Sequence, residues 1–151
     1  MQSNEASKLN PLLKPFAPLI GEWALEGSHP YIPNTTLHGQ VSFGWIEGGA
    51  FVVMRTKVDE PKIPSGISIF GSDDVVGEFF ILYFDERCTS RKYDVSIKDN
   101  IIEWHRTTPE FSQRFTLTIA QDSKTMEGKG TMRKENQDWE DDIQFTYKRI
   151  S

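Results

Sequence analysis

Runs of β-branched and aromatic residues, separated by short clusters of Gly, Asp, Asn, Pro and Ser, follow one another from Gly21 to the end of this 151-residue chain. Such runs are typical of β-strands, and the clusters between them are typical of turns. About ten strands fit the pattern, and the short turns favour an antiparallel meander. Because a meander of this length exposes two edges unless it closes, the sequence predicts an all-β, up-and-down barrel.

The apolar runs set the limits of the expected strands and of a segment before them. In residues 4–20, Leu, Phe and Ile recur at helical spacing but three prolines interrupt them, which predicts one or two short helical turns across an end of the barrel. We expect a single domain, with a lead-in over 1–20 and the barrel over 21–151. The expected strands are 22–27, 37–47, 50–59, 67–71, 77–85, 91–97, 101–108, 111–121, 125–134 and 138–149.

Alternation along each strand assigns side chains to the inner or outer face of the barrel. In the last strand Ile143, Phe145 and Tyr147 share the inner face, whereas Asp142 belongs to the outer set. Residues 78–84 are apolar on both faces, so their orientation is left open. Cover by the N-terminal segment, or by the second subunit of a homodimer, explains such a strand.

The composition excludes several classes of partner. The formal net charge is −5 and the basic residues are scattered, which argues against a nucleic-acid partner. Cys88 is the only cysteine and the start "MQSNEASK" has no apolar run, so we expect a reduced, cytoplasmic protein. No run approaches the roughly 18 apolar residues of a transmembrane helix, and no membrane span is expected.

Motifs for metal binding or nucleophilic catalysis are weak. His29 and His38 lack the spacing and the accompanying Cys of a zinc site, and the acidic run 138–142 lacks the offsets of a calcium loop. Cys88 has no His nearby in the sequence. We therefore predict no metal ligands and no catalytic nucleophile.

The proline-rich lead-in, the "GEW" of residues 21–23 and the closing "FTYKRI" resemble the calycin superfamily of lipocalins, fatty-acid-binding proteins and nitrobindins. Residues 9–33 are most similar to the nitrobindin-like branch, and "GSHP", "EGGAF" and "FSQRF" to uncharacterised bacterial calycin-like proteins. The resemblance implies that Trp23 packs against Arg149 at the closed end of the barrel. It also implies haem held by a His near the C-terminal end, but 139–150 contains no His, so no cofactor is predicted.

Several polar and aromatic residues fall on faces that the pattern directs inward. A buried Arg needs several acceptors or a carboxylate, which comes either from the protein, as from Glu47 or Glu103, or from a ligand; an Arg that points outward needs neither. The resemblance to fatty-acid-binding proteins implies that Arg and Tyr hold a ligand carboxylate. Arg91 belongs to this group, and the candidate ligand-binding residues are Arg106, Tyr93, Gln113, Trp104, Arg55, Trp45 and His29.

These residues favour a barrel that binds a small hydrophobic or amphipathic molecule, with Arg106, Tyr93 and Gln113 as polar anchors. One alternative is an isomerase or cyclase on the same barrel, with His29 or Glu103 as acid or base. Another is a structural module whose barrel is filled by its own side chains. A nitrobindin-like haem protein is disfavoured by the missing His. The fold does not choose among these functions.

Overall fold

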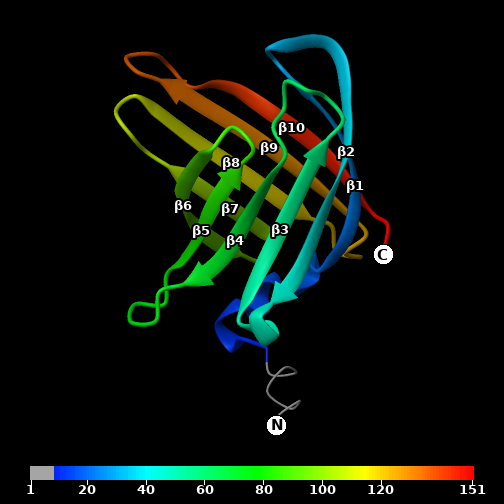
Figure 1. Cartoon of the computed structure of the whole chain (residues 1–151), viewed down its shortest axis with the longest axis vertical. Helices are drawn as coiled ribbons and strands as arrows, with labels where there is room; N and C mark the ends of the chain where they lie inside the picture. Colours follow the sequence, from blue (N-terminus) through cyan, green and yellow to red (C-terminus); the bar gives the residue numbers. More distant parts are fainter. Residues whose placement is uncertain (1–8) are drawn as a thin grey trace.

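Ten antiparallel strands close into a barrel in the computed structural model, which describes residues 9–151 (Figure 1). Each strand pairs with its neighbours in sequence, and β1 pairs with β10 to complete the ring, so no sheet edge stays open. The predicted fold class is confirmed. The strands are β1 (Gly21–His29), β2 (Ile32–Ile46), β3 (Phe51–Val58), β4 (Gly66–Ser72), β5 (Phe79–Asp85), β6 (Thr89–Lys98), β7 (Ile101–Arg106), β8 (Phe111–Ile119), β9 (Thr125–Lys134) and β10 (Glu140–Arg149).

Most strand limits agree with the sequence pattern to within a few residues, and those of β9 agree fully. The largest difference is β2, which begins at Ile32 rather than at residue 37, because Ile32 pairs with His29 at the tip of the β1–β2 hairpin. Residues 33–36 in between are exposed and polar, so no apolar signal marks them. Between β2 and β3, the expected glycine turn is a short 3-10 turn, η2 (Glu47–Gly49), in which Gly48 has a φ of 67°.

The lead-in is a 3-10 helix, η1 (Pro11–Leu19), and it covers one end of the barrel (Figure 1). Pro15 and Pro18 lack an N–H and so exclude a regular α-helix, but the short helix still directs one side inward. On that side Phe16 is fully buried, 5.0 Å from Phe79 and 5.3 Å from Phe70 between ring centroids. The expected helical turns across an end of the barrel are confirmed for the described residues; residues 1–8 lie outside them.

Trp23 and Arg149 meet at this closed end, as the resemblance implies. The guanidinium lies 4.1 Å from the centroid of the indole, and the fully buried indole donates its Nε1–H to the carbonyl of Leu19 (2.9 Å). Arg149 also donates to the carbonyls of Pro18 (2.6 Å) and Ser123 (2.8 Å). One guanidinium thus ties the lead-in, the last strand and the β8–β9 turn together.

The structure also orients β5, which the sequence left open. Phe79, Ile81 and Tyr83 alternate with Phe80, Leu82 and Phe84, and Ile81 is buried inside the barrel while Leu82 and Phe84 are 38% and 40% exposed. The second set lies on the outer face. The lead-in reaches the inner set, at Phe79, so the outer apolar residues of β5 are not covered by it.

The other end of the barrel carries the β1–β2, β3–β4, β5–β6, β7–β8 and β9–β10 connections, opposite η1 (Figure 1). Within residues 9–151, no helix has both the length and the apolar character needed to cross a bilayer. The barrel is therefore covered at one end by a helix and bounded at the other only by hairpin loops, and this second end is where the candidate site lies.

Candidate functional site: a polar relay on the wall of the barrel cavity

A cavity of about 420 Å³ occupies the barrel interior towards the loop end. Its wall includes Ile63 and Pro64 of the β3–β4 connection and Arg87 of the β5–β6 turn, so it opens opposite η1. The interior is therefore not filled by the protein's own side chains, and its size is within the range of small-molecule sites. The apolar part of the wall is formed by Met54, Ile81, Trp104, Phe115, Met132 and Phe145.

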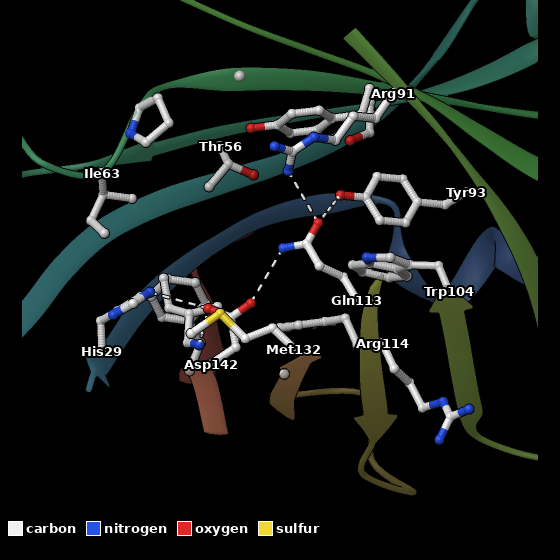
Figure 2. A pocket seen from close by; sticks show the side chains of 18 of the residues that line it. His29, Thr56, Ile63, Arg91, Tyr93, Trp104, Gln113, Arg114, Met132 and Asp142 are labelled. Carbon is white, nitrogen blue, oxygen red and sulfur yellow. Dashed lines mark hydrogen bonds and ion pairs between the residues drawn. The ribbon is translucent and has the colours of Figure 1, made fainter. Parts of the chain in front are cut away.

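Five side chains from four strands form one polar relay along this wall, joined by three hydrogen bonds and one contact between His29 and Asp142 (Figure 2). Arg91 Nη1 (3.1 Å) and the Tyr93 hydroxyl (2.7 Å) both donate to Gln113 Oε1. Gln113 Nε2 donates to Asp142 Oδ2 (3.3 Å), and His29 Nε2 lies 3.1 Å from Asp142 Oδ1. The relay joins β6, β8, β10 and the end of β1.

The partners fix how each member is oriented. A guanidinium can only donate and a carboxylate can only accept, so Gln113 must turn its oxygen to Arg91 and its amide nitrogen to Asp142. The backbone N–H of Tyr31 donates to His29 Nδ1 (3.0 Å), which places the imidazole proton on Nε2, facing Asp142. Neither nitrogen of His29 is free to accept a proton from a molecule in the cavity.

Asp142 reaches the wall because β10 carries an irregularity. Strict alternation predicts Asp142 on the outer face, but the register between β10 and β9 shifts between Asp141 and Gln144. An extra residue there lets Asp142 and Ile143 both line the cavity, as β-bulges commonly do when they redirect a side chain. The outward assignment of Asp142 is thus wrong.

Four cationic side chains line the cavity, and three of them have a carboxylate partner. Arg87 lies 2.6 Å from Asp85, Arg114 lies 3.6 Å from Glu103, and Lys134 lies 4.0 Å from Glu140, each measured between nitrogen and oxygen. Arg91 is the exception: among residues 9–151, no carboxylate lies within ion-pair distance of its guanidinium. Its hydrogen-bond acceptor is a neutral amide, and the ring of Phe111 lies 5.6 Å away.

Burial and charged side chains of both signs act on the hydroxyl of Tyr93. Burial raises the pKa of the Tyr93 hydroxyl, whereas the positive charges of Arg91 and Arg106 oppose that rise. The negative charge of Asp142 acts in the same direction as burial and raises the pKa of this hydroxyl. The Arg106 Nε is buried without a hydrogen-bond partner among the described residues. This part of the wall favours one further negative charge.

A second polar cluster lies on the wall at the end of β5. The Tyr83 hydroxyl donates to Asp85 Oδ2 (2.5 Å), and Arg87 holds the same carboxylate through its side chain (2.6 Å) and its backbone N–H (2.9 Å). These hydrogen bonds, those of Arg87 above all, hold the pKa of Asp85 well below its usual range. Burial, with Asp85 nearby, raises the pKa of Tyr83. All three groups are paired with one another.

Four of the seven residues predicted to bind ligand lie on the cavity wall: His29, Tyr93, Trp104 and Gln113. Arg106 lies opposite Gln113 in the sheet but outside the cavity wall itself. Trp45 is partly buried and packs against the core, away from the cavity wall. Arg55 is exposed on the outer face of β3.

The inward assignment of Arg55 is therefore wrong, and the role offered for Glu103 fails for the same physical reason. Arg55 alternates with Met54 and Thr56, which line the cavity, so its own side chain must point out. Glu103 alternates with Ile102 and Trp104 in the same way, and pairs with Arg114 outside the relay. Glu103 thus cannot act as an acid or base inside the barrel.

The sequence did not identify Asp142, Tyr83 and Tyr147 as wall residues with polar atoms. Tyr147 was directed inward correctly but was treated as core. The available signal was chemical rather than periodic: a buried Arg requires an acceptor, and the two carboxylates offered for it, Glu47 and Glu103, do not line the cavity.

A haem group does not fit the wall as the nitrobindin resemblance would require. His29 is the one His of the chain that lines the cavity, and both of its nitrogens are engaged, by Asp142 and by the backbone of Tyr31. The described part of the cavity wall thus offers no free imidazole to a haem iron. Nor does any group of three or more His, Cys, Asp or Glu within 9–151 have the arrangement of a metal site.

Comparison with known proteins gives a structural neighbour but no family. No protein-family model matches the chain, and no curated protein matches it. The fold is similar to the crystal structure of Rv2717c from M. tuberculosis, with a TM-score of 0.69 and 18% identity over 95% of this chain and 100% of that one. This identity is low, so the likeness shows the fold alone, a ten-stranded antiparallel barrel consistent with the calycin architecture.

A second solved structure is a protein of unknown function from the DUF3598 family of Nostoc punctiforme PCC 73102. It shows a TM-score of 0.29 and 7% identity over 94% of this chain and 100% of that chain. At that score the likeness carries no argument.

Proposed function

We propose that the protein binds a small amphipathic molecule in the barrel, with one negatively charged group at the cavity mouth and an apolar body inside. Arg91 is the observation that carries this proposal. Its guanidinium lines the cavity, is partly buried, and has a neutral amide as its protein acceptor. Gln113 gives Arg91 one neutral acceptor. A ligand carboxylate placed there would instead form charge-assisted hydrogen bonds with the guanidinium, which are stronger.

The rest of the wall suits the apolar body of such a ligand. Trp104 stacks on Phe115 with 4.7 Å between ring centroids, and this pair continues the wall beyond Gln113. Ile81, Met54 and Phe145 are buried and add aliphatic and aromatic surface. An alkyl chain that leaves water for this surface gains roughly 0.8 kcal/mol per methylene group.

Decanoate and decanol test the proposal because they share an apolar body and differ in charge. Calorimetric titration of the intact protein should show decanoate binding more tightly than decanol. Replacing Arg91 by Gln should weaken decanoate binding about tenfold or more, as expected for a hydrogen bond to a charged group, and should leave decanol nearly unaffected.

Arg55→Gln is the matched control, since it removes the same charge from the outer face of β3, where Arg55 does not line the cavity. It should bind decanoate as the parent protein does. Equal affinities for the acid and the alcohol, or an Arg55→Gln variant as weak as Arg91→Gln, would contradict the proposal. Equal affinities would mean that the cavity does not recognise the carboxylate. Equal weakening by the two variants would mean that only the net charge of the protein matters, and not the position of Arg91.

A further inference from the structure

Tyr147 places a hydroxyl inside the cavity without a protein partner. The residue is 2% exposed and lies on the cavity wall, yet no hydrogen bond joins its hydroxyl to any of residues 9–151. Burial alone raises the pKa of this hydroxyl. A buried tyrosine normally directs its O–H to an acceptor, because an unpaired polar group in an apolar site is unfavourable.

The other tyrosines buried on this wall follow that rule. The hydroxyl of Tyr93 donates to Gln113, and that of Tyr83 donates to Asp85. The wall hydroxyls of Thr56 and Ser68 belong to residues that are partly exposed, whereas Tyr147 is buried and lines the cavity. A partner for Tyr147 must therefore come from within the cavity.

The ring of Tyr147 is held by packing, so its hydroxyl has a fixed place. A Cβ added to Gly128 would lie 2.4 Å from Phe115 Cζ and 3.1 Å from Tyr147 Cε1, which means that this glycine makes room for both rings. The Phe145 ring contacts Tyr147 at 5.8 Å between centroids. Such rigid support is typical of a side chain that positions a ligand.

The backbone of Tyr147 lies nearer the closed end of the barrel than the relay does. It pairs with Leu25 and Met126 and comes two residues before Arg149, whose guanidinium forms the closed end with Trp23. Asp142 of the relay comes five residues earlier on β10, which is roughly 16 Å along a strand and somewhat less along the axis of a tilted barrel. The cavity wall thus includes a tyrosine whose backbone lies nearer the closed end than the relay does, with Phe145 between the two along β10.

We propose that Tyr147 binds a second polar group at the far end of the ligand, so that the ligand class is a medium-chain acid with a hydroxyl or carbonyl oxygen at the end opposite its carboxylate. This inference rests on the proposed function, because it takes the acid to lie at Arg91. Tyr147 acts as a specificity-determining residue: it disfavours a plain alkyl end, which leaves its hydroxyl unpaired, and favours an end that pairs with it.

Four affinities test the inference: decanoate and ω-hydroxydecanoate, each titrated into the parent protein and into Tyr147→Phe. The parent protein should prefer the hydroxy acid by roughly tenfold, and Tyr147→Phe should lose or reverse that preference. Decanoate itself should bind Tyr147→Phe at least as tightly as the parent, which also shows that the variant is folded. Tyr31→Phe is the matched control, because it removes a tyrosine hydroxyl that bonds Glu140 at the exposed loop end, and it should keep the preference for the hydroxy acid.

Equal binding of the two acids to the parent protein would overturn the inference while leaving the proposed function intact. A preference for the hydroxy acid that persists in Tyr147→Phe would overturn the inference as well, since a group other than Tyr147 would then bind the ω-hydroxyl of the ligand. If neither acid binds the parent protein, the proposed function fails and this inference with it.

Discussion

Gln113 is the residue on which the candidate site depends, because it links charges of opposite sign without carrying one. Its amide accepts from Arg91 and Tyr93 on one side and donates to Asp142 on the other. A carboxylate at position 113 would form an ion pair with Arg91, and the positive charge of Arg91 would then no longer be available to a ligand. The neutral amide orders the relay and leaves the guanidinium available to a ligand.

The inward direction of Gln113 and Tyr93 could be predicted from the sequence, since both alternate with outward polar residues on regular strands. The position of Asp142 could not, because a shift of one residue in β10 reverses the faces that alternation assigns. Arg55 was predicted to face inward, and Glu103 was offered as a partner for a buried Arg or as an acid or base. Their regular strands place them outside.

The hydrogen bonds to Asp85 predict a pH-dependent stability. Arg87 and Tyr83 hold the pKa of this carboxyl below its unfolded value of about 3.9. The stabilisation is therefore complete above that value and is lost as pH falls through the lower pKa of the folded state. Asp85→Asn should lower the free energy of unfolding at pH 7 by about 1 to 2 kcal/mol, and the difference should shrink below about pH 4.

Urea unfolding at a series of pH values measures this difference. Asp74→Asn is a suitable control because Asp74 is exposed in the β4–β5 turn, and it should change stability by less than about 0.5 kcal/mol at any pH. If the difference in free energy of unfolding between the parent protein and Asp85→Asn stays constant from neutral to acid pH, the charge of Asp85 does not stabilise the fold.

At the scale of elements, the lead-in helix η1 decides which end of the barrel is closed. The spacing of its apolar residues predicted helical turns, and the prolines predicted that they would be short and irregular. The end to which the helix packs could not be read from the lead-in itself, because it depends on contacts of Phe16 with β4 and β5 that are distant in sequence. Likewise, the start of β2 depends on a pairing at the hairpin tip, not on apolar residues.

Removing the Phe16 ring should open the closed end. Phe16 is fully buried and contacts two aromatic rings, so Phe16→Ala should lower the free energy of unfolding by about 3 to 5 kcal/mol. Leu12→Ala lies in the same helix at a side chain that is 49% exposed, and it should cost less than about 0.5 kcal/mol. Urea unfolding of both variants checks this; a similar loss for the two would mean that η1 is not packed as described.

At the scale of the whole molecule, closure of the barrel follows from the number of strands and the short turns between them. The cavity does not follow from the sequence, because its volume depends on how inner side chains from all parts of the barrel share the same space. Its polarity follows only from the three-dimensional register, which brings His29, Asp142, Gln113 and Arg91 together from four strands. The outcome is a barrel with a closed floor, an apolar interior and a charged mouth.

A crystal structure of the complex with ω-bromodecanoate tests this account most directly, because the bromine atom gives an anomalous signal that marks the end of the chain. The account predicts the carboxylate within hydrogen-bond distance of Arg91 and the bromine deep in the barrel, beside Tyr147 and above the Trp23–Arg149 pair. A bromine at the loop end with the carboxylate inside, or density only on the outer face of the barrel, would contradict it.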